Sequence, residues 1–258
     1  MHRRQFLAAA GAGLLQGRSA LAAGASAWRD AEVNGMRYKV LPPAPSAAAP
    51  HPVVLYLHQL DMGDWPDGLV QQVNPWFNTT AFRTQYPCIV VMPLLNQRKD
   101  PAGHWINFGG DRHGYIGEDN AMAALRQVMA ANQVDPRRIY ITGNSLGGMG
   151  TWAMLLGYNR LTGRQGRIFA AGMPLAGTDR SANAVQAARL LRHVPIWAFH
   201  GAHDTKVSPA WDRHMAHLLS GDRTFRYTEY SDLGHEIWDR TYTRHDVWSW
   251  LFAQRGPA

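Results

Sequence analysis

The chain of 258 residues contains a single cysteine, Cys88, and no long apolar run. One cysteine cannot form a disulfide within the chain, and its isolation excludes a cysteine-based zinc or iron–sulfur site. No stretch approaches the roughly 20 apolar residues that a membrane-spanning helix requires. The length and the hydrophobic content of 46% allow one large domain that holds its core without crosslinks.

Lysine is also scarce, since Lys39, Lys99 and Lys206 are the only three. The formal net charge of +7 therefore comes from arginines, which are scattered singly along most of the chain. A nucleic-acid-binding protein usually concentrates its positive charge in one stripe. We therefore expect no nucleic-acid partner.

The first 27 residues hold no acidic residue and have the pattern of an export signal. Arg3 and Arg4 precede a short stretch rich in Ala, Gly and Leu, and small residues surround Ala22 and Ala27. These are the features of a secretory signal peptide, and the arginine pair resembles a twin-arginine signal. We predict a signal peptide over residues 1–27, cleaved after Ala22 or Ala27, and a periplasmic or secreted location. A soluble N-terminal helix is the alternative, and the glycines of this segment disfavour it.

Residues 28–258 are expected to form a single domain in which short apolar runs alternate with segments of helical periodicity. The expected strands are Val53–Leu57, Cys88–Met92, Arg138–Thr142, Phe169–Leu175, Pro195–Phe199 and Phe225–Tyr230. The expected helices are Glu118–Ala131, Leu146–Tyr158, Ser181–Leu191, Trp211–Leu219 and His245–Gln254. Asp135-Pro136 indicates a turn. This order predicts an α/β fold, a mostly parallel central sheet with helices on both faces.

Two long stretches, 60–87 and 93–117, lack clear periodicity. Loops of this length are uncommon in compact domains and are often functional. The first carries Trp65, Trp76 and Phe77, and the second carries Trp105. These aromatic residues either line a substrate cleft or anchor the loops to the body of the protein.

The sequence Gly143-Asn144-Ser145-Leu146-Gly147 matches G-x-S-x-G, and an expected strand leads into it while an expected helix leaves it. A strand–turn–helix around this motif is a nucleophile elbow, in which a strained turn exposes the serine above the sheet. Ser145 is therefore the candidate nucleophile, with the small flanking residues allowing the backbone to close around it.

A serine nucleophile needs a base, and the base needs an orienting acid. In this kind of fold the partners follow in the order Ser, acid, His, each just past the end of a strand. Asp204 and His235 meet both conditions. Asp232 is a competing acid but follows the wrong strand, and His58 is interpreted as a residue that positions its loop.

A metal site is the alternative interpretation of the histidines near Asp204. His200 and His203 lie close to it in sequence, and His214 and His217 follow on an expected helix. No further ligand cluster of known spacing accompanies them, so we expect neither a metal nor another cofactor. The second pair is more simply assigned to a helix surface.

An oxyanion formed at Ser145 needs two N–H donors. One is the amide of Leu146, and the other comes from the loop that begins at His58-Gln59-Leu60.

Together these segments make the chain resemble the α/β-hydrolase superfamily. More narrowly, it is similar to secreted carboxylesterases and peptidases related to polyhydroxybutyrate depolymerases, feruloyl esterases and prolyl-oligopeptidase catalytic domains. The resemblance covers about Val53 to Gln254, including Gly234-His235-Glu236-Ile237-Trp238. It implies Ser145 as nucleophile, His235 as general base and Asp204 as acid.

The same resemblance implies oxyanion donors at Leu146 and Leu60. The family usually has His-Gly after its early strand, whereas this chain has His58-Gln59, so Gln59 is an alternative second donor. Trp105 and Trp238 are the candidate substrate-binding residues.

These observations predict a serine carboxylesterase that acts through an acyl-enzyme on a small-molecule or polymeric ester. A serine peptidase and a non-catalytic binding module on a hydrolase fold are the two alternatives. The pattern leaves the acyl group, the alcohol and the oligomeric state open.

Overall fold

The computed structural model describes residues 27–60, 75–95, 107–109, 116–161, 167–179 and 183–257. Nearly all of the predicted signal peptide, Trp65 and Trp105 lie outside these residues. Among the described helices, none has the length and apolar character needed to cross a bilayer.

A single sheet organises the described part of the chain, with its strands in the order β1-β2-β4-β3-β5-β6-β7-β8. The strands are β1 (Arg29–Val33), β2 (Met36–Leu41), β3 (His51–Leu57), β4 (Ile89–Pro93), β5 (Val134–Asn144), β6 (Ala171–Leu175), β7 (Ile196–Gly201) and β8 (Phe225–Tyr230). Strands β3 to β8 pair in parallel, and β1 and β2 add an antiparallel edge. The prediction of a mostly parallel sheet is confirmed.

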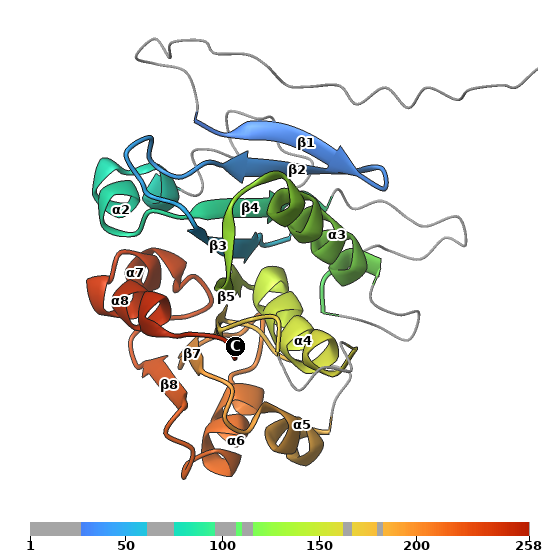
Figure 1. Cartoon of the computed structure of the whole chain (residues 1–258). Helices are drawn as coiled ribbons and strands as arrows, with labels where there is room; N and C mark the ends of the chain where they lie inside the picture. The colour runs from blue at the N-terminus through green and yellow to red at the C-terminus, as the bar shows by residue number, and fades with distance from the viewer. Residues whose placement is uncertain are drawn as a thin grey trace, which may run out of the picture.

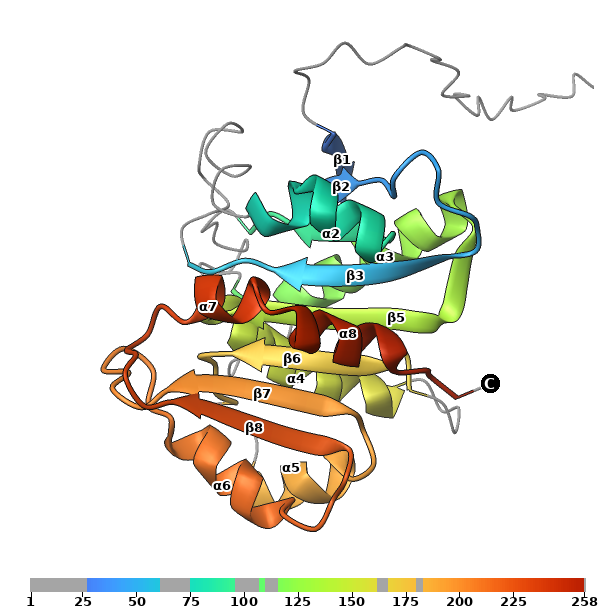
Figure 2. The same cartoon turned by 90° about the vertical axis from the view of Figure 1, so that its left-hand side faces the viewer.

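Helices cover both faces of this sheet (Figures 1 and 2). One face carries α3 (Ile116–Ala131), α4 (Leu146–Leu161), α5 (Ala184–Leu191) and α6 (Ala210–Leu218). The other carries α2 (Thr80–Gln85), α7 (Trp238–Tyr242), α8 (His245–Ala253) and the short 3-10 helix η2 (Pro75–Asn78). The architecture is therefore three-layered, as the alternation of strands and helices predicted.

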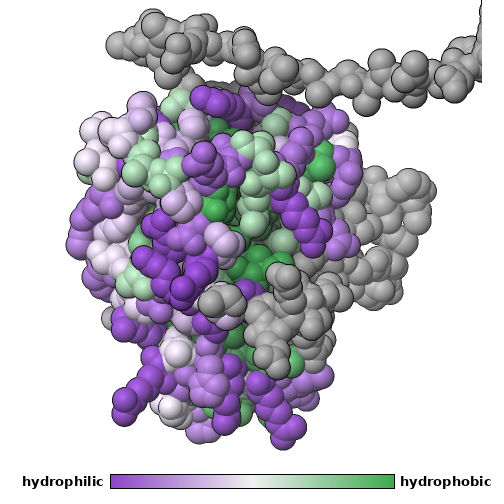
Figure 3. Space-filling view, in the orientation of Figure 1, coloured by the Kyte–Doolittle hydropathy of each residue, from purple (hydrophilic) through white to green (hydrophobic). Residues whose placement is uncertain are grey.

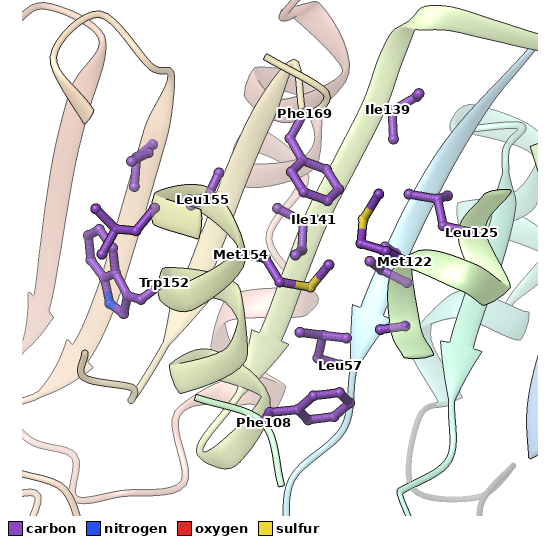
Figure 4. Packing of buried hydrophobic residues seen from close by; sticks show 14 of the residues in the cluster. Leu57, Phe108, Met122, Leu125, Ile139, Ile141, Trp152, Met154, Leu155 and Phe169 are labelled. Carbon is purple, nitrogen blue, oxygen red and sulfur yellow. The ribbon is translucent and has the colours of Figure 1, made fainter. Parts of the chain in front are cut away.

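Two apolar cores form because successive side chains of a strand point to opposite faces of the sheet. In β3, Val53 and Leu55 belong to the core under α3 and α4, while Val54 and Tyr56 belong to the core under α2 and α8. All of these side chains are fully buried, which explains why the central strands read as continuous apolar runs. Figure 4 shows part of the first core, where side chains of β5 and α4 pack together.

Some elements were missed from the sequence because they are short. The β1–β2 hairpin turns at Asn34-Gly35, where both residues have positive φ angles of 51° and 74°. An Asn-Gly pair between alternating residues is the usual signal for such a turn. Helices α2 and α7, with 6 and 5 residues, are too short to show periodicity.

The prediction of a turn at Asp135-Pro136 is corrected by the structure, because these residues lie within β5, which begins at Val134. Asp135 accepts hydrogen bonds from the Arg137 amide (2.9 Å) and from Arg138 Nε (2.6 Å), so the local bonds are those of a turn. The pairing with β3 is irregular at this point, where the register shifts between His51 and Val53. The chain passes through this irregularity without leaving the sheet.

The parallel strands all end at the same edge of the sheet, where their arrowheads meet in Figure 2. Loops that leave this edge therefore lie near one another, which is where ligands bind in open α/β sheets. On the face seen in Figure 3, polar residues cover most of the surface and apolar residues gather near its middle. Among the described residues, the exposed large apolar side chains are Leu60 and Val185, at 48% and 44%.

Candidate active site

Ser145 stands in a sharp turn between the end of β5 and the start of α4. Its φ angle is +56°, in the left-handed region that residues other than glycine seldom adopt. The turn is held from below, because the Ser145 amide donates to the carbonyl of Leu175 at the end of β6 (2.9 Å). The strained elbow predicted from the motif is present.

Gly147 allows this elbow to press against the end of β3. A Cβ atom added at Gly147 would lie 1.9 Å from the carbonyl oxygen of Leu57 and 2.8 Å from that of His58. Both are backbone atoms that no side-chain rotation can move away. The second glycine of the motif is therefore required by backbone contact, and it brings the elbow beside the loop that follows β3.

A chain of hydrogen bonds joins three side chains that follow β5, β7 and β8. His235 Nε2 lies 2.8 Å from Ser145 Oγ, and His235 Nδ1 lies 2.7 Å from Asp204 Oδ2. An ionised carboxylate only accepts, so Nδ1 carries the proton and Nε2 is free to accept from the serine hydroxyl. The histidine is thus in the tautomer that can remove a proton from Ser145.

Asp204 is buried and is surrounded by donors. Its Oδ1 accepts from the amides of Lys206 and Val207 (both 2.9 Å), and its Oδ2 lies 2.7 Å from His235 Nδ1 and 3.1 Å from His200 Nε2. Burial opposes ionisation, but the hydrogen bonds from Val207, His235 and Lys206 outweigh it and lower the pKa of Asp204. The carboxylate therefore stays charged at neutral pH and keeps the ring of His235 oriented.

His58 orients the loop after β3. The Leu95 amide donates to His58 Nε2 (3.0 Å), which leaves the ring proton on Nδ1, beside the Gln59 carbonyl at 2.5 Å. The C=O and N–H of a trans peptide point in opposite directions, so this contact turns the Leu60 N–H away from the ring. His58 is therefore a residue that fixes the peptide plane of one predicted oxyanion donor.

Solved structures with a similar fold include esterases and peptidases. A thermostable esterase matches with a TM-score of 0.67 and 22% identity, over 88% of this chain and 62% of that chain. A feruloyl esterase module from Clostridium thermocellum matches with a TM-score of 0.62 and 14% identity, over 88% and 87% of the two chains. For an acylaminoacyl peptidase the TM-score is 0.57 at 14% identity, over 86% of this chain and 40% of that chain. The chain has the α/β-hydrolase fold.

This chain thus spans less than two thirds of the thermostable esterase, of which 62% is covered. No protein-family model matches its sequence, and no curated protein does. At identities of 14% to 22% the structural matches establish the fold and leave the activity to the chemistry of the site.

Within this α/β-hydrolase fold, the competing acid and histidines lie apart from the serine. Asp232 is exposed and pairs with Arg240 (2.7 Å), while His203, His214 and His217 are exposed to solvent. Among the described residues, no group of three or more His, Cys, Asp or Glu side chains is placed to hold a metal ion. His200 is different, because it is fully buried and reaches Asp204 directly.

A second hydrogen-bonded chain links the elbow of this α/β-hydrolase fold to the loop after β3. Tyr56 Oη donates to Asn144 Oδ1 (2.7 Å), and Asn144 Nδ2 donates to Gln59 Oε1 (2.9 Å). The side chain of Gln59 thus ties the loop to the residue before Ser145. This side chain therefore braces the loop, and the amides of Leu60 and Gln59 both stay predictions for the second donor.

Replacing Asn144 with alanine is expected to lower the free energy of unfolding by about 1–3 kcal/mol, because it leaves the buried hydroxyl of Tyr56 without its acceptor. The measurement is urea denaturation of the parent and of Asn144→Ala, each also in a Tyr56→Phe background. In that background the cost of Asn144→Ala should fall by about 1 kcal/mol. Additive costs within about 0.5 kcal/mol would contradict the bridge.

Two of the aromatic residues singled out in the sequence anchor their loop to the core, and a third lies beside His235. Trp76 and Phe77 are buried in the core under α8, so they anchor their loop instead of lining a cleft. Trp238 begins α7 and packs edge-on against the ring of His235, with centroids 5.7 Å apart. Trp238 therefore supports the position of the histidine, and its contact with substrate stays a prediction.

Proposed function

We propose that this protein is a serine hydrolase that cleaves carboxylic esters through an acyl-enzyme. The observation that supports this most strongly is the hydrogen-bonded order Ser145, His235, Asp204, with distances of 2.8 Å and 2.7 Å. A nucleophile, its base and the acid that orients the base are recognised by this geometry and not by sequence position.

The reaction begins when Ser145 Oγ attacks the ester carbonyl and its proton passes to His235 Nε2. The tetrahedral intermediate collapses as His235 returns this proton to the leaving alcohol, which leaves an acyl group on Ser145. Water then enters, gives a proton to His235 and releases the acid, and the serine recovers its proton. Asp204 stabilises the imidazolium in both steps without taking up the proton itself.

The negative charge of each tetrahedral intermediate needs N–H donors fixed in advance. The Leu146 amide stands at the start of α4, where the helix dipole also favours an anion. The Leu60 amide belongs to the peptide plane held by His58. We propose these two amides as the oxyanion hole. Each would lower the activation free energy by on the order of 3–4 kcal/mol.

Hydrolysis of a p-nitrophenyl ester series, from acetate upward, is the direct test. We expect turnover by the purified chain, with an optimum that reports the size of the acyl pocket. A fluorophosphonate probe should label the same preparation, because only an activated serine reacts with it. Labelling without ester turnover but with cleavage of peptide p-nitroanilides would identify the peptidase alternative. Neither labelling nor turnover would favour a binding module.

A further inference from the structure

A second histidine lies against the acid of the triad. His200 is the penultimate residue of β7, and its side chain is fully buried. Its Nε2 faces Asp204 Oδ2 at 3.1 Å and the carbonyl of Val207 at 3.0 Å, and its Nδ1 faces Asp212 Oδ2 at 2.7 Å. Asp212 comes from α6 and is itself fully buried. One imidazole ring therefore sits between two carboxylates.

The partners of this ring determine where its protons lie. A backbone carbonyl can only accept, so the contact with Val207 requires a proton on Nε2. On the other side, Asp212 Oδ1 already accepts from Trp152 Nε1 (3.1 Å), which stabilises the ionised carboxylate. The short contact between Nδ1 and Asp212 Oδ2 needs a second proton. The geometry therefore calls for one proton on Nε2 and a second between Nδ1 and Asp212 Oδ2, and the hydrogen bond that Trp152 donates to Asp212 favours placing the second proton on the ring.

The surrounding charges also favour a cation here. Asp204 and Asp212 contact the ring, and Glu229 on β8 is close enough to interact with it electrostatically. Arg213 neutralises Glu229 through two hydrogen bonds of 2.8 Å, while Tyr227 donates to the same carboxylate. With Glu229 paired in this way, two buried carboxylates remain for His200 to balance.

The directions of the pKa shifts agree with a proton held at this place. Burial opposes the imidazolium, yet the hydrogen bond to Asp212 and the nearby negative charges outweigh it and raise the pKa of His200. Burial raises the pKa of Asp212, and the hydrogen bonds from His200 and Trp152 act against that rise. The hydrogen bonds with Arg213 lower the pKa of Glu229 to about 2, so its charge persists at all working pH values.

We propose that His200 is a buried imidazolium, clamped by Asp212, whose positive charge beside Asp204 weakens the hold of that carboxylate on the proton of His235. Both histidines use the same oxygen, Asp204 Oδ2. A cation there disfavours a second cation on His235, because like charges at such distances repel. His200 is therefore a positioning residue that keeps the triad base neutral at lower pH. This role rests on the proposed function, whereas the charge of His200 does not.

The variant Asp212→Asn separates the effect of the positive charge on His200 from the effect of its hydrogen bonds. The new amide can still accept from Trp152 through its oxygen and can donate to His200 Nδ1 through its nitrogen, so the hydrogen bonds survive while the ring becomes neutral. Without the cation, Asp204 stabilises the protonated form of His235 more strongly. We expect the acid limb of the pH profile to move to higher pH by about half a unit to one unit.

The pH dependence of fluorophosphonate labelling and of ester kcat/KM would be measured for the parent and for Asp212→Asn. Asp246→Asn is the matched control, because it removes an exposed carboxylate that pairs with Arg244 and should leave the profile unchanged. An acid limb that does not move in Asp212→Asn would overturn the proposed influence on His235. A parent that neither labels nor turns over would instead reject the proposed function.

Nitrogen chemical shifts of the His200 ring in the parent test the charge without any activity and do not depend on the folding of a variant. Two protonated nitrogens from pH 5.5 to pH 8.5 are expected. One unprotonated ring nitrogen at pH 7 would overturn the proposal.

Discussion

Ser145→Ala is expected to lower kcat for ester hydrolysis by a factor on the order of 10⁴ to 10⁶. The variant lacks the hydroxyl oxygen that lies 2.8 Å from His235 Nε2 and that the proposed mechanism uses as nucleophile. His235→Ala should cost a similar factor, and the double variant should be no worse than either single one, because the residues act as a unit. Steady-state kinetics on the best p-nitrophenyl ester would measure all three.

The fold should survive the loss of the nucleophile. Alanine and serine meet the same strain at a φ of +56°, so Ser145→Ala should unfold within about 1 kcal/mol of the parent. Ser145→Gly removes the strain and is expected to be inactive and more stable. Ser220→Ala, at an exposed position, is the control that should retain full activity. Turnover by Ser145→Ala within tenfold of the parent would refute the assignment of the nucleophile.

Gly201→Ala is expected to cost more than about 4 kcal/mol of unfolding free energy, enough to leave much of the protein unfolded. A Cβ atom at Gly201 would lie 1.9 Å from the Gly234 carbonyl oxygen and 2.6 Å from that of Leu233. At this crossing the loop that carries Asp204 passes against the loop that carries His235. Alanine forces the two loops apart, and the neighbouring hydrogen bond from the His203 amide to the Leu233 carbonyl (3.0 Å) is lost as well.

Gly221→Ala provides the matched control, because nothing lies within 4 Å of a Cβ atom built there. Its stability should stay within about 1 kcal/mol of the parent, or rise slightly as the unfolded chain loses freedom. Guanidinium denaturation would give both values, with soluble yield as a second readout. A Gly201→Ala protein as stable as Gly221→Ala would show that the two loops can separate at little cost.

The placement of Ser145, Asp204 and His235 together could be predicted because each requirement is local. Ser145 and Asp204 follow strands that are recognisable from their apolar runs, and His235 follows a strand recognisable from its alternating pattern. Parallel strands bring their carboxyl ends to one edge. The sheet itself was predictable for the same reason. The two antiparallel edge strands β1 and β2 were not. Strand β1 is short and mostly exposed, and the apolar residues of the largely buried β2 are interrupted by Arg37 and Lys39, so neither strand shows an apolar run.

The contact between His200 and Asp212 could not be read in the same way. It depends on how α6 packs against the sheet, which no local pattern specifies. One signal was present: Asp212 lies three residues before Met215 and seven before Leu219, on the apolar side of its helix. A carboxylate at such a position must find a buried partner, since an unpaired buried charge is costly.

The order of strands in the sheet also determines which part of the site is lost first when the protein is heated. Strand β1 lies at one edge and β8 at the other, and each pairs with a single neighbour. Native proteins open locally at such places well before they unfold as a whole. Fraying of β1 leaves the serine elbow and its partners in place, whereas fraying of β8 releases the loop that holds His235. We therefore expect heating to separate His235 from Ser145 by fraying at the β8 edge before the central strands melt.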